Sequence, residues 1–177
     1  MKYFCAIFFY FIFFTEISFA QFSRKVDSLS AICNNAATDA EKVKAYGELA
    51  ELYFIYQLNN AGDSVLQKQI RVAELSGDKS VMLSALFGTA ITNLTNWNSK
   101  ETFDNAIHFF QKGLDYSKAI GRDDYLALCY VRLAAFYRKS GKLDESFYNA
   151  NNAFTSSLNI NNDSIKIIAA IELGDVY

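Results

Sequence analysis

Apolar and polar residues alternate with a helical period along most of the chain. Apolar side chains recur three, four and seven positions apart, most clearly at Leu126, Cys129, Tyr130, Leu133 and Tyr137. This spacing places them on one face of an α-helix. Between polar turn segments, the pattern predicts helices over about residues 40–57, 63–76, 79–95, 102–119, 123–139 and 143–158, with a further helix from about 163.

Four short segments of the predicted helices look alike. Each has a large apolar residue, then a small one, then a large apolar residue four positions after the first: Leu49–Tyr53, Phe87–Ile91, Leu133–Tyr137 and Leu173–Tyr177. Their first residues are 38, 46 and 40 positions apart. We expect the small residues, Ala50, Gly88, Ala134 and Gly174, to lie where two helix backbones approach closely. Self-similarity at this period is typical of stacked helical hairpins.

In these segments the chain resembles the tetratricopeptide repeat family, whose pattern is W-x2-L-G-x2-Y and later A-x3-F. Leu173, Gly174 and Tyr177 match the first part, and Ala106 and Phe110 match the second. The repeats here are longer than the family's 34 residues and lack its terminal proline. HEAT or armadillo repeats have a closer period, but they do not explain the small residues. The resemblance covers about residues 40–177 and implies an all-α, right-handed α-solenoid.

The two ends of the array are predicted to differ from its middle. Residues 21–38 carry Phe22, Val26, Leu29 and Cys33 on one face, which predicts a helix packed on the front of the first hairpin. Residues 39–177 hold about three and a half hairpins. The last predicted helix is apolar and has no following helix to cover it, so we expect the parent protein to continue and the array to be truncated at its C-terminus.

The first 20 residues have the order of a secretory signal. Lys2 is followed by an apolar run over residues 3–14, and Ser18 and Ala20 put small residues before a cleavage point at Gln21. A membrane anchor is the alternative, but a span needs about 20 apolar residues and Glu16 interrupts this run. We therefore expect residues 1–20 to be a cleaved signal peptide and the protein to be exported, to the periplasm or outside the cell. In this respect it is similar to exported repeat proteins of Bacteroidetes-type bacteria.

Candidate catalytic chemistry is sparse in this sequence. His108 is the single histidine, so a histidine-based metal site is excluded, and no phosphate-binding glycine loop is present. Cys33 and Cys129 are far apart and have apolar neighbours, so two buried thiols are favoured over a disulfide or a zinc site. We expect no enzyme activity, no cofactor and no metal. The net charge of −2, without a basic cluster, argues against nucleic acid as a partner.

The remaining candidate site is the concave face of the solenoid, which the first helix of each hairpin lines in such arrays. Helical spacing predicts that its side chains include Lys44, Glu51, Thr89, Thr92, Asn93, Arg132, Arg138 and Asp175. We expect a scaffold that binds a protein or a peptide there. The alternative is the extracytoplasmic sensory region of a longer signalling protein, either a histidine kinase or a helix-turn-helix regulator. Membrane contact is expected only through the signal peptide or through a downstream span in the parent protein.

Overall fold

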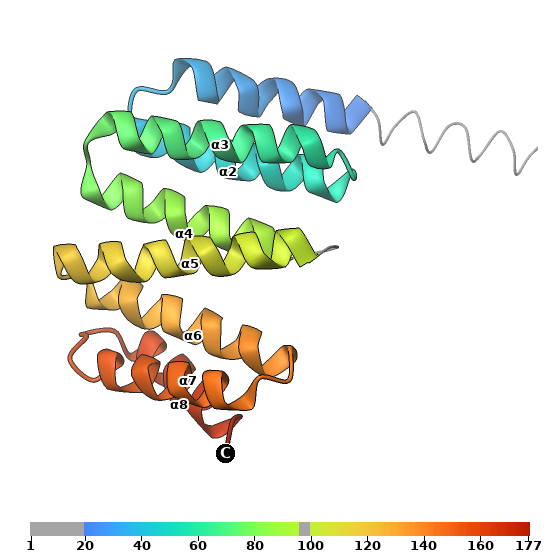
Figure 1. The fold of residues 1–177 in the computed structure, drawn as a ribbon. Helices are drawn as coiled ribbons and strands as arrows, with labels where there is room; N and C mark the ends of the chain where they lie inside the picture. Colours follow the sequence, from blue (N-terminus) through green and yellow to red (C-terminus); the bar gives the residue numbers. More distant parts are fainter. Residues whose placement is uncertain (1–19, 96–99) are drawn as a thin grey trace, which may run out of the picture.

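A computed structural model of the chain describes residues 20–95 and 100–177, so the predicted signal peptide lies almost wholly outside the described residues. Over the described residues the chain forms eight helices, stacked in chain order from the blue end to the red end in Figure 1. A helix over residues 20–35 comes first. The others are α2 (Asp39–Ile55), α3 (Asn59–Ser76), α4 (Lys79–Thr95), α5 (Lys100–Ile120), α6 (Asp123–Lys139), α7 (Leu143–Ser157) and α8 (Asp163–Gly174).

Successive helices pack as antiparallel hairpins. The pairs α2–α3, α4–α5 and α6–α7 form the most extensive contacts, and α8 begins a fourth unit (Figure 1). The first helices of neighbouring units also pack on one another, α2 on α4 and α6 on α8. This is the all-α solenoid of helical hairpins expected from the periodicity. The main difference in helix bounds is α3, which begins at Asn59 and not near residue 63.

Local signals in the sequence set the helix ends. Thr38 forms a capping box with Glu41 at the start of α2: the Thr38 Oγ1 accepts a hydrogen bond from the Glu41 backbone N–H at 3.2 Å. Asp78 and Asn162 accept equivalent bonds at the starts of α4 and α8. Gly141, in the break between α6 and α7, has a φ of 75°, a left-handed conformation that glycine adopts without strain.

Small residues lie where the two helices of a hairpin meet. Ala50, Ala90 and Ala134 are all fully buried, and each lies eleven positions after the first residue of its helix. The Ser146 hydroxyl on α7 donates a hydrogen bond to the Ala134 carbonyl at 2.8 Å, so the two backbones are in close approach there. The structure corrects the second segment: Ala90, and not Gly88, is the counterpart of Ala50 and Ala134.

The N-terminal helix over residues 20–35 covers the front of the first hairpin, as predicted. Leu29 and Cys33 are buried in the cluster that includes α2 and α3 residues. The ring of Phe22 lies 6.2 Å from that of Tyr53 and 4.3 Å from that of Tyr56, between centroids. This helix therefore closes the apolar side of α2 that would otherwise face water.

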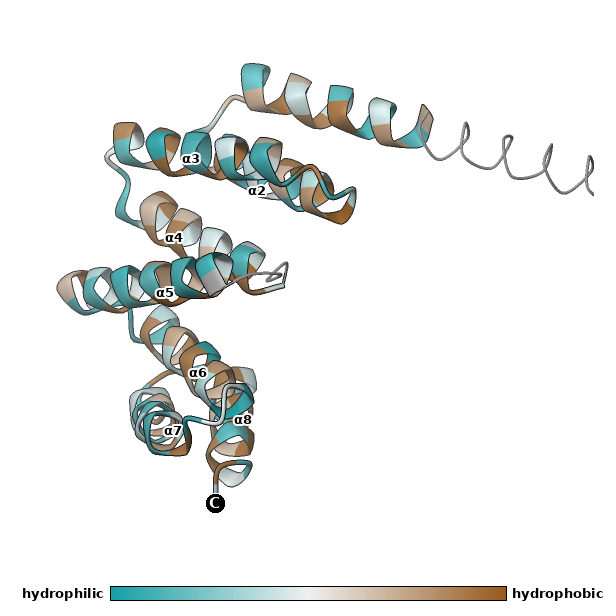
Figure 2. Ribbon diagram, turned by 45° about the vertical axis from the view of Figure 1, so that its right-hand side comes forward, coloured by the Kyte–Doolittle hydropathy of each residue, from teal (hydrophilic) through white to brown (hydrophobic). Residues whose placement is uncertain are grey.

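Hydropathy differs between first and second helices. In Figure 2, α4 and α8 are mostly pale to brown, whereas α3 and α5 carry more teal residues. The second helices are amphipathic, with one face toward the core and one toward solvent. On α8 the apolar side chains that remain exposed are Ile167, Ile168 and Ile171.

Candidate functional site

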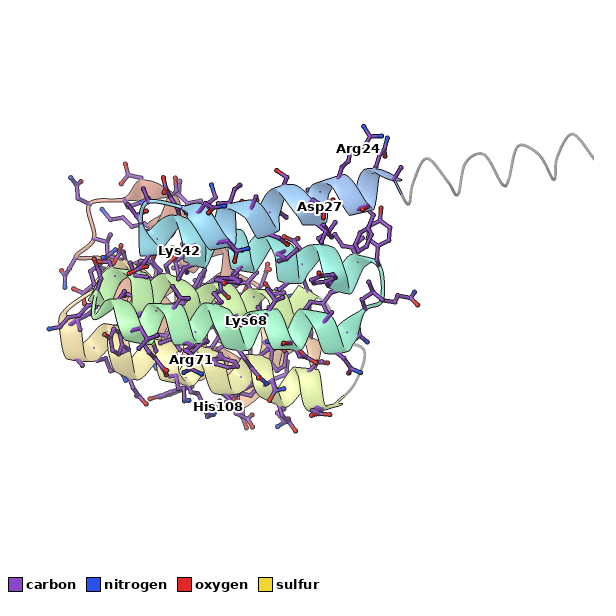
Figure 3. The ribbon with its side chains drawn as sticks, turned by 90° about the horizontal axis from the view of Figure 1, so that it is seen from above. Arg24, Asp27, Lys42, Lys68, Arg71 and His108 are labelled. Atoms are coloured by element: carbon purple, nitrogen blue, oxygen red, sulfur yellow. The ribbon has the colours of Figure 1, made fainter. Side chains whose placement is uncertain are left out.

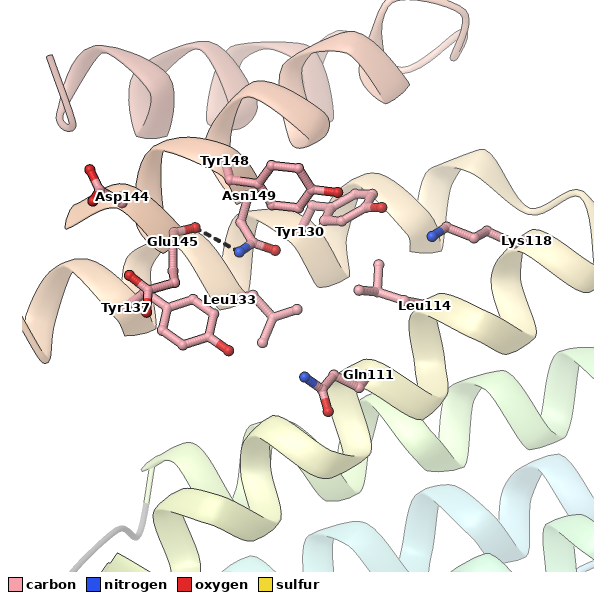
Figure 4. A pocket seen from close by; sticks show the side chains of 10 residues that line it. All are labelled: Gln111, Leu114, Lys118, Tyr130, Leu133, Tyr137, Asp144, Glu145, Tyr148 and Asn149. Carbon is pink, nitrogen blue, oxygen red and sulfur yellow. Dashed lines mark hydrogen bonds between the residues drawn. The ribbon is translucent and has the colours of Figure 1, made fainter. Parts of the chain in front are cut away.

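Two pockets lie between successive second helices, each with a first helix as its floor. The α3–α5 cleft has α3 and α5 as walls and α4 as floor, with a volume of about 650 Å³. The α5–α7 cleft has α5 and α7 as walls and α6 as floor, with a volume of about 500 Å³ (Figure 4). The two clefts are therefore the same structural feature, one repeat apart.

Five of the ten side chains that line the α5–α7 cleft are apolar or aromatic, and the other five are polar or charged, among them Asp144 and Glu145. Tyr130, Leu133 and Tyr137 form its floor (Figure 4). Lysines of the protein already lie over two of these rings: the Nζ of Lys118 is 5.7 Å from the centroid of Tyr130, and that of Lys142 is 5.8 Å from the centroid of Tyr137. Its hydrogen bond with Tyr130 raises the pKa of Lys118. These cation–π contacts are thus satisfied within the chain.

The floor of the α3–α5 cleft is polar at the corresponding positions. The first helices begin at residues 39, 79, 123 and 163, which are 40, 44 and 40 apart. Ten and fourteen residues after these starts, α6 has Leu133 and Tyr137, whereas α4 has Thr89 and Asn93. Thr89 and Asn93 both line the cleft and are only 1% and 3% exposed.

A buried amide joins three helices beneath this cleft. Gln69 on α3 is 2% exposed. Its Nε2 donates a hydrogen bond to the Val43 carbonyl of α2 at 2.9 Å, and its Oε1 accepts one from the Thr89 hydroxyl of α4 at 3.0 Å. Gly47 makes room for this side chain: a Cβ there would lie 2.9 Å from Nε2, whereas a Cβ at Gly88 would lie at an ordinary contact distance of 3.5 Å from it.

The walls of the α3–α5 cleft carry charges of both signs. The acidic side chains are Asp63 and Glu74 on α3 and Glu101 on α5, and the basic ones are Arg71 on α3 and Lys112 on α5. Within residues 20–95 and 100–177, none of the five forms an ion pair. Burial, and then the charge of Glu101, raise the pKa of Asp63, so these two carboxylates repel each other across the cleft.

The opposite face of the first helices is where most of the predicted binding residues lie. On a helix of 3.6 residues per turn, the fifth and twelfth residues after the start lie on the opposite side of the helix from the cleft-lining residues at positions seven, ten and fourteen. Position five holds Lys44 on α2, and position twelve holds Glu51 on α2 and Asp175 just after α8; all three are exposed. Arg132 is also exposed and lies close to this face. We call it the first-helix face.

Three of the predicted residues do not belong to this face. Thr89 and Asn93 point to the α3–α5 cleft, and Thr92 is 8% exposed, so all three are buried where an accessible row was expected. The physical reason is the shifted register in the second repeat. Thr89 and Asn93 occupy the places of Leu133 and Tyr137, which face the second helices.

Arg138 lies at the edge of the first-helix face and links α6 to α8. Its Nε donates to a Glu172 carboxylate oxygen at 3.1 Å, and its NH2 group is 3.3 Å from an Asp175 carboxylate oxygen. The side chain of Glu172 is 10% exposed, so this pair is largely shielded from water. The hydrogen bond to Glu172 raises the pKa of Arg138. Two predicted residues, Arg138 and Asp175, are therefore brought together by the structure.

The described residues offer little for catalysis or metal binding. Over residues 20–95 and 100–177, no group of three His, Cys, Asp or Glu side chains gathers closely enough to hold a metal ion. Cys33 and Cys129 are free and buried in separate clusters, as expected, and burial raises the pKa of Cys129 to about 12. His108 is exposed on α5 and lines the α3–α5 cleft. No helix in this part of the chain is both long and apolar enough to cross a membrane.

The walls of the α3–α5 cleft were missed by reasoning from the sequence alone. Counting from the polar turns, and not from the large-small-large segments, would have placed Thr89 and Asn93 opposite the second helices. Whether Asp63 and Glu101 lie across the cleft from each other depends on the angle between neighbouring hairpins, and no local pattern in the sequence predicts that angle.

Comparison with solved structures supports the fold. The structure of BtubC (BKLC) from P. vanneervenii matches with a TM-score of 0.71 and 16% sequence identity, over 92% of this chain and 65% of that one. A signal transduction ATPase with numerous domains from Pyrococcus horikoshii, which has a tetratricopeptide repeat sensor, matches with a TM-score of 0.68 and 16% identity. That match covers 92% of this chain and 24% of the other.

These matches concern architecture. The chain spans 65% and 24% of the lengths of the two proteins, and identities of 16% show the fold alone. No protein-family model matches the sequence, and no curated protein matches it either. The described chain is thus a tetratricopeptide-like helical-repeat solenoid, with two clefts between its second helices and an accessible face on its first helices.

Proposed function

We propose that this protein is a scaffold that binds a protein or a peptide along its first-helix face. The observation that carries the proposal is that this face is accessible in every repeat. Position five of the first helices holds Lys44, Ser84, Leu128 and Ile168, and none of these residues is buried. Position twelve likewise stays at least partly exposed on all four units. An accessible face on the first helix of each unit suits an extended partner, because each repeat can contribute a contact.

The chemistry of this strip favours a partner with mixed charge. At the α2 end, Lys44 and Glu48 form an exposed pair with 3.9 Å between Nζ and Oε1, and Glu51 is exposed nearby. At the α6 end, Arg132 is exposed and forms no ion pair with any residue of 20–95 or 100–177. Ion pairs at such exposed positions contribute little to stability, so these charges are available to a partner.

Site-specific photo-crosslinking in the native host would test this function. A photoreactive amino acid at Lys44, Glu51 or Arg132 is expected to yield the same partner adduct by mass spectrometry. The same group at Lys68, exposed on α3, is the matched control and should yield no such adduct. Equal labelling from Lys68, or no adduct from the first-helix face, would contradict the proposal.

We also propose that the protein is exported and that it performs no catalysis. Export is supported by the signal-like order of residues 1–20, which places Gln21 at the mature N-terminus. Mass spectrometry of the purified protein is expected to find a chain that starts at Gln21. Retention of Met1 in exported or membrane-bound protein would show an anchor in place of a cleaved signal.

A second candidate is the sensory region of a longer signalling protein. It is favoured by the similarity to an ATPase whose repeat array is described as a sensor, and in which the matched part is 24% of the chain. Sequencing the gene beyond residue 177 distinguishes the two. A membrane span followed by a kinase or DNA-binding domain would establish the sensory role, whereas a stop codon or further repeats would remove it.

A further inference from the structure

The turn between α2 and α3 has the same backbone conformation as the turn between α6 and α7. The middle residue of each turn is left-handed, with a φ of 60° at Gln57 and 75° at Gly141. The next residue, Leu58 or Lys142, donates its backbone N–H to the carbonyl five residues earlier, at 2.9 Å in both turns. The side chains of the two turns can therefore be compared position by position.

The side chains of the two turns differ in character. Residues 139–142 in the α6–α7 turn are small or polar, with glycine at the left-handed position. The α2–α3 turn has Gln57 at that position, and a residue other than glycine is strained in this conformation. Beside it, Tyr56 and Leu58 are 40% and 45% exposed, and Ile55 is 64% exposed. A strained turn therefore holds three large apolar side chains in solvent, and we call these three residues the apolar turn.

Two basic residues lie beside the apolar turn, on the N-terminal helix. The ring of Phe22 lies 4.3 Å from that of Tyr56, between centroids, which places the start of this helix against the turn. Arg24 and Lys25 follow on the same helix and are exposed, and neither forms an ion pair with any residue of 20–95 or 100–177. Figure 3 shows Arg24 at the end of the helix from which the grey trace leaves, with Asp27 farther from that end.

This end of the molecule is also where the predicted signal joins the array. The N-terminal helix begins at the end of the stack at which the α2–α3 turn lies (Figure 1). Residues 3–14 form the apolar run of the predicted signal. Such a run enters the membrane during export, and residue 20 and the apolar turn would then lie at the lipid surface. Cleavage before Gln21 removes the run but leaves the apolar turn, Arg24 and Lys25 on the mature chain.

The size and charge of this surface favour lipid over protein as its occupant. A stable protein interface involves about 20–30 residues a side, whereas the apolar turn has three. Insertion among lipid headgroups needs only projecting apolar side chains, an aromatic ring at the interface and basic groups nearby. Arg24 and Lys25 supply charge opposite to that of anionic headgroups. On the three helices that meet here, the first acidic residues are about one helical turn farther from this end: Asp27, Glu51 and Asp63.

We propose that the apolar turn, together with Arg24 and Lys25, attaches the mature chain to the surface of a membrane that contains anionic lipids. Ile55 and Leu58 enter the boundary between headgroups and acyl chains, and Tyr56 lies at the level of the headgroups. The two basic side chains bind lipid phosphate groups. This contact is additional to the signal peptide and the downstream span, through which membrane contact was expected from the sequence. It uses one end of the array and leaves the first-helix face open to a protein partner.

Co-sedimentation of the mature chain with lipid vesicles tests this attachment. Vesicles of equal parts phosphatidylglycerol and phosphatidylcholine should bind the chain, and added salt should weaken the binding. Vesicles of phosphatidylcholine alone should bind it about 10-fold more weakly, because the attraction of the two basic residues is lost. The double substitutions Ile55→Ser with Leu58→Ser, and Arg24→Gln with Lys25→Gln, should each weaken binding to the anionic vesicles about 10-fold or more.

Two matched pairs of substitutions serve as controls. Leu75→Ser with Leu158→Ser removes two leucines that are 78% and 56% exposed at the opposite end of the helices. Lys68→Gln with Arg71→Gln removes two exposed basic residues from the middle of α3. Both pairs should bind vesicles as the unaltered chain does. Gln57→Gly relieves the strained backbone and keeps the three apolar side chains, so it should also retain binding.

Several outcomes would overturn the proposal, once circular dichroism has shown that each variant is folded. These are no binding to either kind of vesicle, equal binding to both kinds, an equal loss in the Leu75 and Leu158 pair, and undiminished binding in the variants of the apolar turn or of the two basic residues. None of these outcomes bears on the proposed scaffold function, because photo-crosslinking on the first-helix face tests that function separately.

Discussion

The close fit of Gln69 against Gly47 predicts that the effect of replacing Gly47 by alanine changes sign when Gln69 is removed. Replacing glycine by alanine inside a helix stabilises it by about 1 kcal/mol. At Gly47, however, the added Cβ would lie 2.9 Å from Gln69 Nε2, so the amide must move. Its bond to the Val43 carbonyl, also 2.9 Å, is then lost. A buried amide left without this partner costs about 1–3 kcal/mol, so we expect Gly47→Ala to destabilise the protein by about 1 kcal/mol.

Removing the amide should reverse this effect. In a Gln69→Ala background the space beside Gly47 is vacant, and Gly47→Ala is expected to stabilise by about 1 kcal/mol. The coupling between the two sites is then about 2 kcal/mol. Gly88→Ala is the matched control: its Cβ would lie at an ordinary 3.5 Å from the same amide nitrogen. It should therefore stabilise in both backgrounds.

Urea unfolding followed by circular dichroism at the helical band measures all of these variants. Stabilities should be compared at equal slopes, because a change in slope would indicate a different unfolded state. In thermal melts each 1 kcal/mol corresponds to about 2–4 °C for a domain of this size. If Gly47→Ala changes the stability in the same direction with and without Gln69, the amide of Gln69 is not held between the helices.

Three further predictions concern other contacts. Ala134→Leu should destabilise by about 1–3 kcal/mol, since the residue is fully buried against α7; an unchanged melting temperature would contradict this packing. Asp63→Asn should stabilise the folded protein near neutral pH, because the pKa of Asp63 in the folded state is raised above 3.8 and folding therefore favours its protonated form. The advantage of asparagine should vanish as the pH falls through that pKa. If the advantage persists at low pH in urea titrations, the raised pKa of Asp63, which comes from burial and then from the charge of Glu101, is not its cause. Arg138→Gln should increase hydrogen exchange in α8 more than in α6, and equal exchange would show that the contacts to Glu172 do not hold α8.

Much of the fold follows from the sequence because its signals are local. The period of apolar residues and the polar turns depend on neighbours within a few positions, and six of the seven helices predicted from residue 40 onward start close to their observed first residues. The start of α3 was placed too late because its first turn, at Asn59, has neither an apolar period nor a side-chain cap. The N-terminal helix was predicted correctly from one face that carries Phe22, Val26 and Leu29.

The candidate site was less predictable because it depends on register between repeats. Gly88 and Ala90 are both small, and the sequence pattern fitted either one. Choosing Gly88 as the residue of close contact rotated the predicted concave face about the axis of the helix, so Thr89 and Asn93 were included among its residues. Only the packed structure shows Ala90 against the second helix and Asn93 beneath the cleft. The same is true of Gln69 on α3, whose side chain fits against Gly47 of α2.

The buried amide of Gln69 also distinguishes one junction of the array from the others. At the next junction Gly113 of α5 faces Cys129. On α7 the counterpart of Gln69 is the fully buried Ala153, which lies nineteen residues after Ala134, just as Gln69 lies nineteen residues after Ala50. Similar hairpins can exchange neighbours within a chain or between chains. A hairpin that docked on α3 without a hydroxyl like that of Thr89 would leave the amide oxygen buried without its donor. The junction therefore discriminates among otherwise similar partners, so that the order of the units in space follows their order along the chain.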